Sequence, residues 1–351
     1  MADNFRPMVA SIIPVLNEAD SISDCLTSLC NQSYPAKLHQ IHIFDGGSTD
    51  DTWKLAEDFI KTKPNRYPEI FLHHNPGKYV AEARNLSLEV VPKTVEYFLE
   101  IIGHCLVSRD HIDSLVKTMG QLQQSTNNNV GALGVSVVSK GGNLALVESW
   151  IEAGMLSPLV RGNGQFAVFS GVEETNVPAF CLHYRKALTD VGGWDTRFIT
   201  SQDSDISMRM KKHGYQLFRT GSVKVKMAKR STLTSWSKMG FRYGFWRTKL
   251  MKRHPERASI REFLPWFGVV LTLLLLFSAN KYWWLPPCLY LAVISLEGIR
   301  SAIVTRKVSS IVGVPLIIIC LHTSFSIGLL YGLFGKTRSF NERELNKSNL
   351  N

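Results

Sequence analysis

The stretch "FDGGSTDDT", Phe44–Thr52, ends an apolar run and supplies an acid, two glycines and a series of hydroxyl and carboxylate side chains. A bound nucleotide requires carboxylates that accept hydrogen bonds from its ribose hydroxyls and base N–H groups, and glycines where the backbone approaches it closely. Asp45, Gly46 and Gly47 meet both requirements. In a purely structural interpretation, Asp45 and Ser48 only shape a turn, and Ser48 with Asp51 forms a capping box at the start of a helix.

Apolar runs alternate with segments of helical periodicity on both sides of this stretch. We expect strands over residues 8–15, 40–45, 69–74 and 95–102, and helices over residues 22–29, 53–60 and 79–90. This alternation is typical of βαβ units and predicts an α/β fold with a mostly parallel sheet. Ligands bind at the carboxyl ends of such strands, so Asn17, Glu18 and Asp45 should lie along one edge. The residues "GHC" at 103–105 follow the fourth strand and should join them.

The chain carries a formal net charge of +11, and its basic residues are concentrated between residues 209 and 261, directly before three apolar segments. Basic residues beside membrane spans favour the cytoplasmic side and bind anionic lipid headgroups. We therefore expect membrane lipids as a partner. Nucleic acid is not expected as a partner, because the basic residues are concentrated directly before the apolar segments.

The three apolar segments are Phe263–Ala279, Tyr282–Ile299 and Ser309–Phe334. A membrane-spanning helix needs about 20 apolar residues, so the first two predict a tight hairpin or a partly interfacial pair. The basic residues that follow the second and third segments both favour the cytoplasmic side. Three full spans cannot satisfy both groups, so either the tail crosses despite its charge or the third segment is re-entrant, as Pro315 would permit. The basic residues are Arg300, Arg306 and Lys307 after the second segment, and Lys336, Arg338, Arg343 and Lys347 after the third.

The composition divides the chain into four parts. We expect a mixed α/β domain over residues 1–230, a basic amphipathic juxtamembrane segment over 231–262, a membrane region with two to three apolar helices over 263–335, and a polar tail over 336–351. Core helices of a soluble protein are the structural alternative for the apolar part.

Several stretches together resemble glycosyltransferase family 2, inverting enzymes with the GT-A fold. They are "SIIPVLNEADSISDCLTSL" (11–29), "IFDGGSTDDT" (43–52), "AEARNLSL" (81–88) and "GGWDTRFITSQDSDISMRMKKHGYQL" (192–217). The stretch "FRYGFWRTKLMKRHPERASIREFLP" (241–265) is similar to membrane-attached glucosyltransferases of succinoglycan-type exopolysaccharide assembly. The resemblance covers about residues 9–265. It implies a Rossmann-like mixed sheet flanked by helices and followed by C-terminal transmembrane helices.

The resemblance also implies roles for individual residues. Asp203 in "SQDSD" matches the catalytic base, and Asp205 matches the second acidic position. An inverting transfer needs such a carboxylate to take the proton of the acceptor hydroxyl. Glu18 and Asp45 match the acids that contact uridine, and Arg84 matches a basic residue near the diphosphate. The complete donor site expected from the resemblance and the strand ends comprises Pro14, Asn17, Glu18, Asp45, Gly47, Arg84, Asp205, Arg242, Trp246 and Arg247.

The stretch "EIIGHC", residues 100–105, departs from the family pattern of two acids that bind a metal. Ile102 stands at the first acidic position and His104 at the second. A divalent cation, Mg²⁺ or Mn²⁺, held by the diphosphate, His104 and water is one hypothesis. Charge offset by Arg84 and the basic residues 242–252 without a metal is another, and an inactive protein is a third. The presence of Glu18, Asp45, Arg84 and Asp203 argues against the third.

Two functions follow. The first is a membrane-attached inverting glycosyltransferase at the inner (cytoplasmic) membrane, with its catalytic domain facing the cytoplasm. It would move a sugar from a nucleotide-sugar donor, UDP-hexose by family resemblance, to a lipid-linked saccharide acceptor in polysaccharide or cell-envelope glycan synthesis. The second is a non-catalytic membrane partner of a polysaccharide assembly complex. The absence of a Q-x-x-R-W element favours addition of one sugar per acceptor.

Overall fold

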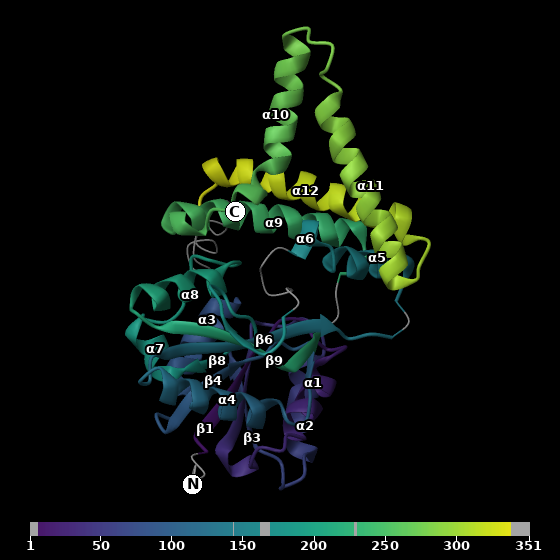
Figure 1. Ribbon diagram of the computed structural model, residues 1–351. Helices are drawn as coiled ribbons and strands as arrows, with labels where there is room; N and C mark the ends of the chain where they lie inside the picture. The colour runs from purple at the N-terminus through teal and green to yellow at the C-terminus, as the bar shows by residue number, and fades with distance from the viewer. Residues whose placement is uncertain (1–5, 143, 162–168, 228–229, 338–351) are drawn as a thin grey trace, which may run out of the picture. The chain divides into compact units, whose positions relative to one another are not determined.

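The computed structural model describes residues 6–142, 144–161, 169–227 and 230–337. These residues form two compact units (Figure 1). The first unit contains residues 6–140 and 169–227, and the second contains residues 141–161 and 230–336. The predicted tail over residues 336–351 lies almost entirely outside the described residues.

The first unit is built on a mixed sheet of nine strands in the order β3-β2-β1-β4-β8-β6-β9-β5, with β7 paired to β9. Four neighbouring strands, β1 to β4, run parallel, and β8 is antiparallel to β4. The strands are β1 (Met8–Val15), β2 (His39–Asp45), β3 (Glu69–His74), β4 (Val95–Glu100), β5 (Cys105–Val107), β6 (Val130–Ser139), β7 (Val172–Glu174), β8 (Leu182–Tyr184) and β9 (Gln216–Met227). The predicted α/β fold with parallel strands is therefore confirmed.

The predicted strand over residues 95–102 was too long, because β4 ends at Glu100. The chain turns there, and the backbone N–H of Cys105 donates to the carbonyl of Ile102 over 3.2 Å. From this turn β5 leaves to pair with β9 instead of continuing beside β1. Two apolar residues thus follow the strand without belonging to it.

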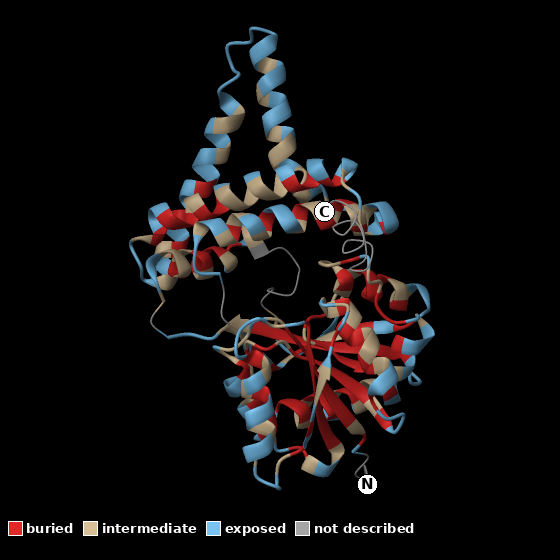
Figure 2. Cartoon of the chain, turned by 180° about the vertical axis from the view of Figure 1, so that it is seen from behind, coloured by how far each residue is buried: buried red, intermediate tan, exposed pale blue. Residues whose placement is uncertain are grey.

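Helices cover both faces of this sheet, and Figure 2 shows the strands buried between them. One core lies under α1, α2 and α4, and the other lies under α3, α7 and α8. The helices are α1 (Ile22–Cys30), α2 (Thr52–Thr62), α3 (Val80–Val90), α4 (His111–Ser125), α7 (Arg185–Asp190) and α8 (Gln202–Lys212), with a 3₁₀ turn η1 (Ala36–Leu38). Because the side chains of β1 pack into both cores, all of its residues except the first are buried. A strand buried on both faces reads as a continuous apolar run.

The second unit consists of helices alone among its described residues. They are α5 (Leu146–Met155), α6 (Pro158–Arg161), α9 (Leu233–Arg253), η2 (Pro255–Arg257), η3 (Ile260–Glu262), α10 (Leu264–Phe277), α11 (Leu285–Thr305) and α12 (Ser310–Phe334). Residues 141–161 were expected in a domain of residues 1–230, but α5 packs on the C-terminal helices. Ile151 shares a core with Trp236 and Ile317.

Helices α11 and α12 are long and apolar enough to cross a membrane, whereas α10 is apolar but has 14 residues. Pro315, which was expected to permit a re-entrant segment, does not interrupt α12. A proline inside a helix leaves the carbonyl four residues earlier without its N–H donor. That carbonyl, on Ile311, faces Gly298 of α11, where a Cβ atom would lie only 2.5 Å from it.

Candidate active site

The loops after β1 and β2 are bonded to each other. The backbone N–H of Asn17 donates to Ser48 Oγ over 2.9 Å, and Asn17 Oδ1 accepts from the N–H of Thr49 over 2.8 Å. The N–H of Glu18 donates to Thr52 Oγ1 over 2.7 Å. Ser48 therefore joins two loops instead of capping a helix, and α2 begins after Asp51 without a side-chain cap. The predicted meeting of these two motifs at one edge is confirmed.

Asp45 ends β2 and presents one unused oxygen. Its Oδ1 accepts from the backbone N–H groups of Gly47 and Ser48 over 2.7 and 2.8 Å. Its Oδ2 is buried and has no hydrogen-bond partner among the described residues. A buried acceptor without a partner costs free energy, so such an oxygen is suited to a ligand donor.

Two glycines shape the backbone around this carboxylate. A Cβ atom at Gly46 would lie 2.3 Å from the carbonyl oxygen of Lys78, and Gly47 has a φ of +82°. Pro14 is buried in β1, opposite Phe44 of β2. Any larger side chain at residue 46 would push the adjoining loop away from Asp45.

His104 lies against Glu18. Its Nδ1 is 2.7 Å from Glu18 Oε1, and the two side chains are 37% and 20% exposed. A carboxylate oxygen accepts the hydrogen bond, so Nδ1 carries a proton, and Nε2 is the nitrogen that a neutral imidazole would offer to a metal. Carboxylates orient metal-binding imidazoles in this way. Gly103 permits the contact, because a Cβ atom there would lie 2.9 Å from Glu18 Cγ.

This turn offers a restricted set of metal ligands. Ile102 packs against the first core and has no donor atom in its side chain. The Nε2 atom of His104 remains, with Glu18 orienting the ring. This nitrogen fits a divalent cation that takes its other ligands from a diphosphate and water.

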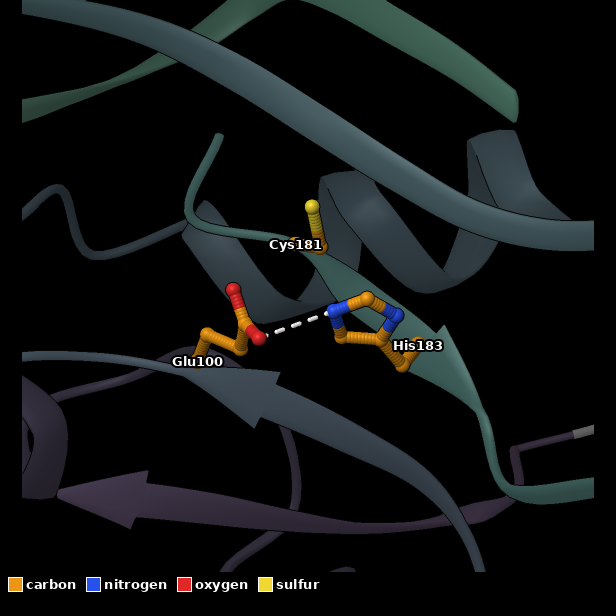
Figure 3. Close-up of side chains that lie close together, drawn as sticks. All are labelled: Glu100, Cys181 and His183. Carbon is orange, nitrogen blue, oxygen red and sulfur yellow. Dashed lines mark ion pairs between the residues drawn. The ribbon is translucent and has the colours of Figure 1, made fainter. Parts of the chain in front are cut away.

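Glu100, the first residue of "EIIGHC", belongs to a different cluster. Its Oε1 lies 3.2 Å from Arg84 Nη1. The same oxygen lies 3.0 Å from His183 Nε2 (Figure 3). All three side chains are at most 6% exposed. Burial opposes the ionisation of Glu100, but Arg84 and His183 outweigh it and hold its pKa below the usual range. The negative charge of Glu100 is therefore paired with neighbouring side chains.

Cys181 completes a group with Glu100 and His183 whose donor atoms lie within 4.8 Å of one another. Two facts argue against a metal there. Arg84 already contacts the same Glu100 oxygen, and burial raises the pKa of the Cys181 thiol well above its usual value. A thiol must lose its proton to bind a metal, so this group is better described as a buried ion-pair cluster.

Asp203 lies in the first turn of α8 and shares Arg84 with Glu100. Arg84 Nη1 donates to Asp203 Oδ1, while Asp203 Oδ2 accepts no hydrogen bond from any described residue. Desolvation raises the pKa of Asp203 above its usual value; Arg84 opposes this shift and Glu100 adds to it. The side chain is still 42% exposed. A carboxylate with a raised pKa and an open oxygen is suited to accept a proton.

The backbone before this carboxylate is constrained. Ser201, which precedes α8, has a φ of +68°. Non-glycine residues rarely adopt this left-handed conformation, and they occur preferentially at functional sites.

Asp205 makes contacts that stabilise the fold, although it is only two residues from Asp203. It is fully buried, and its Oδ2 accepts from Arg209 Nε over 2.9 Å. Arg209 also donates to the carbonyls of Val191 and Gly193 over 2.5 and 2.6 Å. Asp205 thus orients the arginine that holds the loop carrying "GGWD", and donor binding by its carboxylate stays a prediction.

Sequence reasoning missed several residues of this site. Asn85 Nδ2 donates to the carbonyl of Trp194 and Asn85 Oδ1 accepts from its N–H, over 2.7 and 2.8 Å. These bonds hold the Trp194 ring with its centroid 5.5 Å from the Arg84 guanidinium. Glu100 and His183 were also missed. The "ARN" triplet was a signal for Asn85, whereas no local pattern marks His183.

Three predicted donor-site residues lie on α9, in the second unit. Arg247 Nε donates to Glu262 over 2.8 Å, and Trp246 is buried against Phe245. Arg242 is exposed, with its guanidinium 5.9 Å from the ring centroid of Tyr243. Arg247 is therefore already paired, and binding of donor phosphates by these residues stays a prediction.

Comparisons with known proteins agree with this geometry. The family model "Glycosyl transferase family 2" matches residues 11–135, and "Glycosyl transferase family group 2" matches residues 177–296, together more than half of the chain. The chain is 23% identical over 333 residues to the dolichyl N-acetyl-alpha-D-glucosaminyl phosphate 3-beta-D-2,3-diacetamido-2,3-dideoxy-beta-D-glucuronosyltransferase of Methanococcus voltae. That match covers 95% of this chain and 99% of the relative.

A second relative is the succinoglycan biosynthesis protein ExoA of Rhizobium meliloti, which is 24% identical over 254 residues. The match covers 72% of this chain and 73% of that protein. Among solved structures, the mannosyltransferase PcManGT from Pyrobaculum calidifontis, in complex with GDP-Man and Mn²⁺, has the same fold. Its TM-score is 0.58 at 16% identity, covering 94% of this chain and 88% of that chain. The chain thus has the GT-A fold, belongs to glycosyltransferase family 2, and is a sugar-transferring enzyme.

Proposed function

We propose that this protein is a membrane-attached, inverting glycosyltransferase that moves a sugar from a nucleotide-sugar donor to a lipid-linked saccharide acceptor. The observation that carries the proposal is the state of Asp203. Its Oδ1 is held by Arg84, its Oδ2 is open, and its pKa is raised above the usual value. This is what a general base for an acceptor hydroxyl requires.

In the proposed reaction, Asp203 Oδ2 takes the proton of the acceptor hydroxyl. The hydroxyl oxygen forms a bond to the anomeric carbon from the face opposite the diphosphate. The bond between that carbon and the diphosphate oxygen breaks, and the nucleoside diphosphate leaves with the electron pair. One displacement inverts the anomeric configuration. Arg84 fixes Asp203 in position, and Glu100 keeps that arginine oriented.

The donor nucleotide would bind at the joined loops after β1 and β2. The unpartnered Oδ2 of Asp45 supports this assignment, because a ribose hydroxyl or a base N–H would satisfy it. Family resemblance favours a UDP-hexose. Glu18, which the structure pairs with His104, would contact both the nucleotide and the metal region.

A divalent cation at His104, Mn²⁺ or Mg²⁺, would supply positive charge to the leaving diphosphate. Imidazole favours Mn²⁺ of the two, and the structural relative was solved with Mn²⁺. The metal-free hypothesis has less support, since three of the basic groups that it requires already have partners, whereas Arg242 is exposed. Arg84 contacts two carboxylates, Arg247 contacts Glu262, and Lys249 donates to the carbonyl of Gly335.

The lipid-linked acceptor and the membrane attachment draw support from the apolar helices α10, α11 and α12 and from the dolichyl phosphate in the name of the first relative. The concentration of basic residues beside these helices favours the inner membrane with the catalytic unit in the cytoplasm. The alternative drawn from the sequence, a non-catalytic membrane partner, is not supported by the family comparison. The apolar Ile102 at an expected ligand position is the observation that would favour it.

The test is transfer of label from a panel of radiolabelled UDP-sugars into the lipid fraction of isolated membranes, with and without EDTA. Asp203→Asn and His104→Ala are compared with exposed controls, Asp58→Asn and His213→Ala. Transfer that is lost in Asp203→Asn and is sensitive to EDTA and to His104→Ala supports the proposal in full. Transfer that is resistant to EDTA refutes the proposed requirement for a divalent cation. Absence of transfer with retained UDP binding favours the non-catalytic partner.

A further inference from the structure

Helices α9 and α12 lie side by side and run in the same direction (Figure 1). Trp236 near the start of α9 donates from Nε1 to the carbonyl of Ile317 over 3.0 Å. Further along, Thr248 Oγ1 donates to the carbonyl of Leu329 over 2.8 Å. Contact therefore continues over several turns, about 20 Å at a rise of 1.5 Å per residue.

The close approach depends on glycines at a spacing of four in both helices. These are Gly240 and Gly244 in "GFRYG" and Gly328 and Gly332 in "GLLYG". A Cβ atom at Gly244 would lie 2.0 Å from the carbonyl oxygen of Phe325, and one at Gly328 would lie 2.1 Å from that of Phe241. Small residues at this spacing allow two helix backbones to touch. The two helices are thus locked along their lengths.

The end of α12 is also bound to α9. Lys249 Nζ donates to the carbonyl of Gly335, and Lys252 Nζ donates to the carbonyl of Leu333 over 3.1 Å. Cations near the last carbonyls of a helix satisfy them and oppose the macrodipole. The C-terminus of α12 consequently lies beside the most basic part of α9.

This partnership conflicts with a transmembrane α12. Although its composition suits a span, a spanning α12 would carry α9 into the hydrocarbon core with it. Helix α9 has six Lys and Arg residues between residues 238 and 253. Transferring each of these charges into lipid would cost free energy. Four of them are exposed on the helix surface, namely Lys238, Arg242, Lys252 and Arg253.

The opposite face of α12 explains its apolar composition. Exposed apolar side chains recur along it at helical spacing, at Val312, Ile319, Ile327, Leu330 and Phe334. An apolar face on one helix beside basic residues on its partner is typical of structures that lie in the membrane interface. Headgroups and water would receive the charges, and acyl chains would cover the apolar face.

We propose that α9 and α12 lie together in the plane of the membrane surface, so that both ends of α12 are on one side of the bilayer. The α10–α11 hairpin is then the part that enters the bilayer. This inference rests on the proposed membrane attachment. It also resolves the conflict between the two basic groups, since Arg306 and Lys307 before α12 and Lys336 after it lie on the same side.

Cysteine labelling of the full chain in sealed membrane vesicles of both orientations tests the proposal. Cys288→Ala and Cys320→Ala remove the two cysteines that are not buried. Val308→Cys, before α12, and Lys336→Cys, after it, are then treated separately with a membrane-impermeant maleimide. We expect both to react in the same vesicle orientation. Reaction in opposite orientations would mean that α12 crosses the bilayer, and the proposal would be wrong.

A depth measurement keeps the test decisive if a labelling site is shielded. Nitroxides attached to Val312→Cys, Ile319→Cys and Leu330→Cys should report one common depth for an in-plane helix. A deep middle between shallow ends would overturn the proposal. Sedimentation with carbonate-washed membranes distinguishes a failure of the proposed membrane attachment from a failure of this inference about α12. A chain that is washed off refutes membrane attachment and this inference together, whereas an attached chain with a crossing α12 refutes this inference alone.

Discussion

The turn after β4 separates two clusters that hold charge in opposite ways. On one side, Glu100, Arg84 and His183 are at most 6% exposed and partner one another. On the other side, four residues later, His104 and Glu18 form a pair that is 37% and 20% exposed. In the buried cluster each charge depends on its partner, because water cannot replace it. In the exposed pair water can replace either partner. Stability and chemistry should therefore respond differently to changes on the two sides.

The largest effect on the rate of sugar transfer is expected at Asp203, the carboxylate that contacts the buried cluster and is partly exposed to solvent. Asp203→Asn keeps an oxygen that can accept from Arg84 but removes the proton acceptor. We expect the initial rate of sugar transfer to fall by about two to four orders of magnitude. The unfolding temperature of the detergent-solubilised chain should fall less than for Glu100→Gln, because the Asp203 side chain is 42% exposed. A transfer rate within a few-fold of that of Asp58→Asn would contradict the assignment of the base.

Glu100→Gln tests the buried cluster directly. It leaves Arg84 buried with one charged partner fewer, and breaking a buried pair costs about 3–5 kcal/mol of stability. Denaturation of the full chain measures this loss. Glu100 has a lowered pKa, so its contribution to stability is present above its unfolded pKa and is lost as the pH falls toward the folded value. The mutant should show less loss of stability over that acidic range, and an unchanged pH dependence would refute the role given to Glu100.

The same substitution has a second readout. Glu100 adds to the raised pKa of Asp203 and Arg84 opposes it. Removing the charge of Glu100 should therefore lower the pKa of Asp203 and move the acid limb of the transfer rate to lower pH. A purely structural role for Glu100 would leave the position of that limb unchanged among the molecules that remain folded.

Asp45→Asn examines a carboxylate that backbone N–H groups hold, in contrast to both clusters. The asparagine would direct an amide donor to the position where Oδ2 now lacks a partner. Loss of a hydrogen bond to a charged group costs about 1.5–3 kcal/mol, so the Kd for UDP should rise about 10- to 100-fold. Titration calorimetry measures it. Asp51→Asn, exposed in the same stretch, is the matched control and should bind UDP normally.

The smallest effect on stability is expected at the exposed pair. His104→Ala should change the free energy of unfolding by at most about 1 kcal/mol. The same variant should need roughly tenfold more Mn²⁺ for half-maximal transfer. A stability loss as large as that of Glu100→Gln would remove the distinction between the two clusters. An unchanged Mn²⁺ requirement would exclude His104 as a ligand.

Local pattern was sufficient for much of the first unit. The strands over residues 8–15 and 69–74 were predicted with their observed bounds. The first is buried on both faces, and such a parallel strand is a continuous apolar run between turn residues. The loop acids followed from position alone, since parallel strands end at one edge. Strand β9 was missed because Lys224 and Lys226 were assigned to a basic membrane-side segment. In the structure they alternate with buried Val223 and Val225 along the strand.

The sequence by itself thus determined the α/β architecture, the family and the acids at the strand ends, since short-range periodicity and motif order encode them. Only the tertiary structure decided which acids carry chemistry. Arg84 and Asp203 are 119 residues apart, and Asp205 differs from Asp203 only by the side of α8 on which it lies. Likewise, hydropathy made α12 a possible span, whereas its contact with basic α9 argues for the membrane surface. Hydrophobic periodicity describes one helix or strand at a time. Which residue a charged side chain or a glycine contacts depends on how the elements pack together.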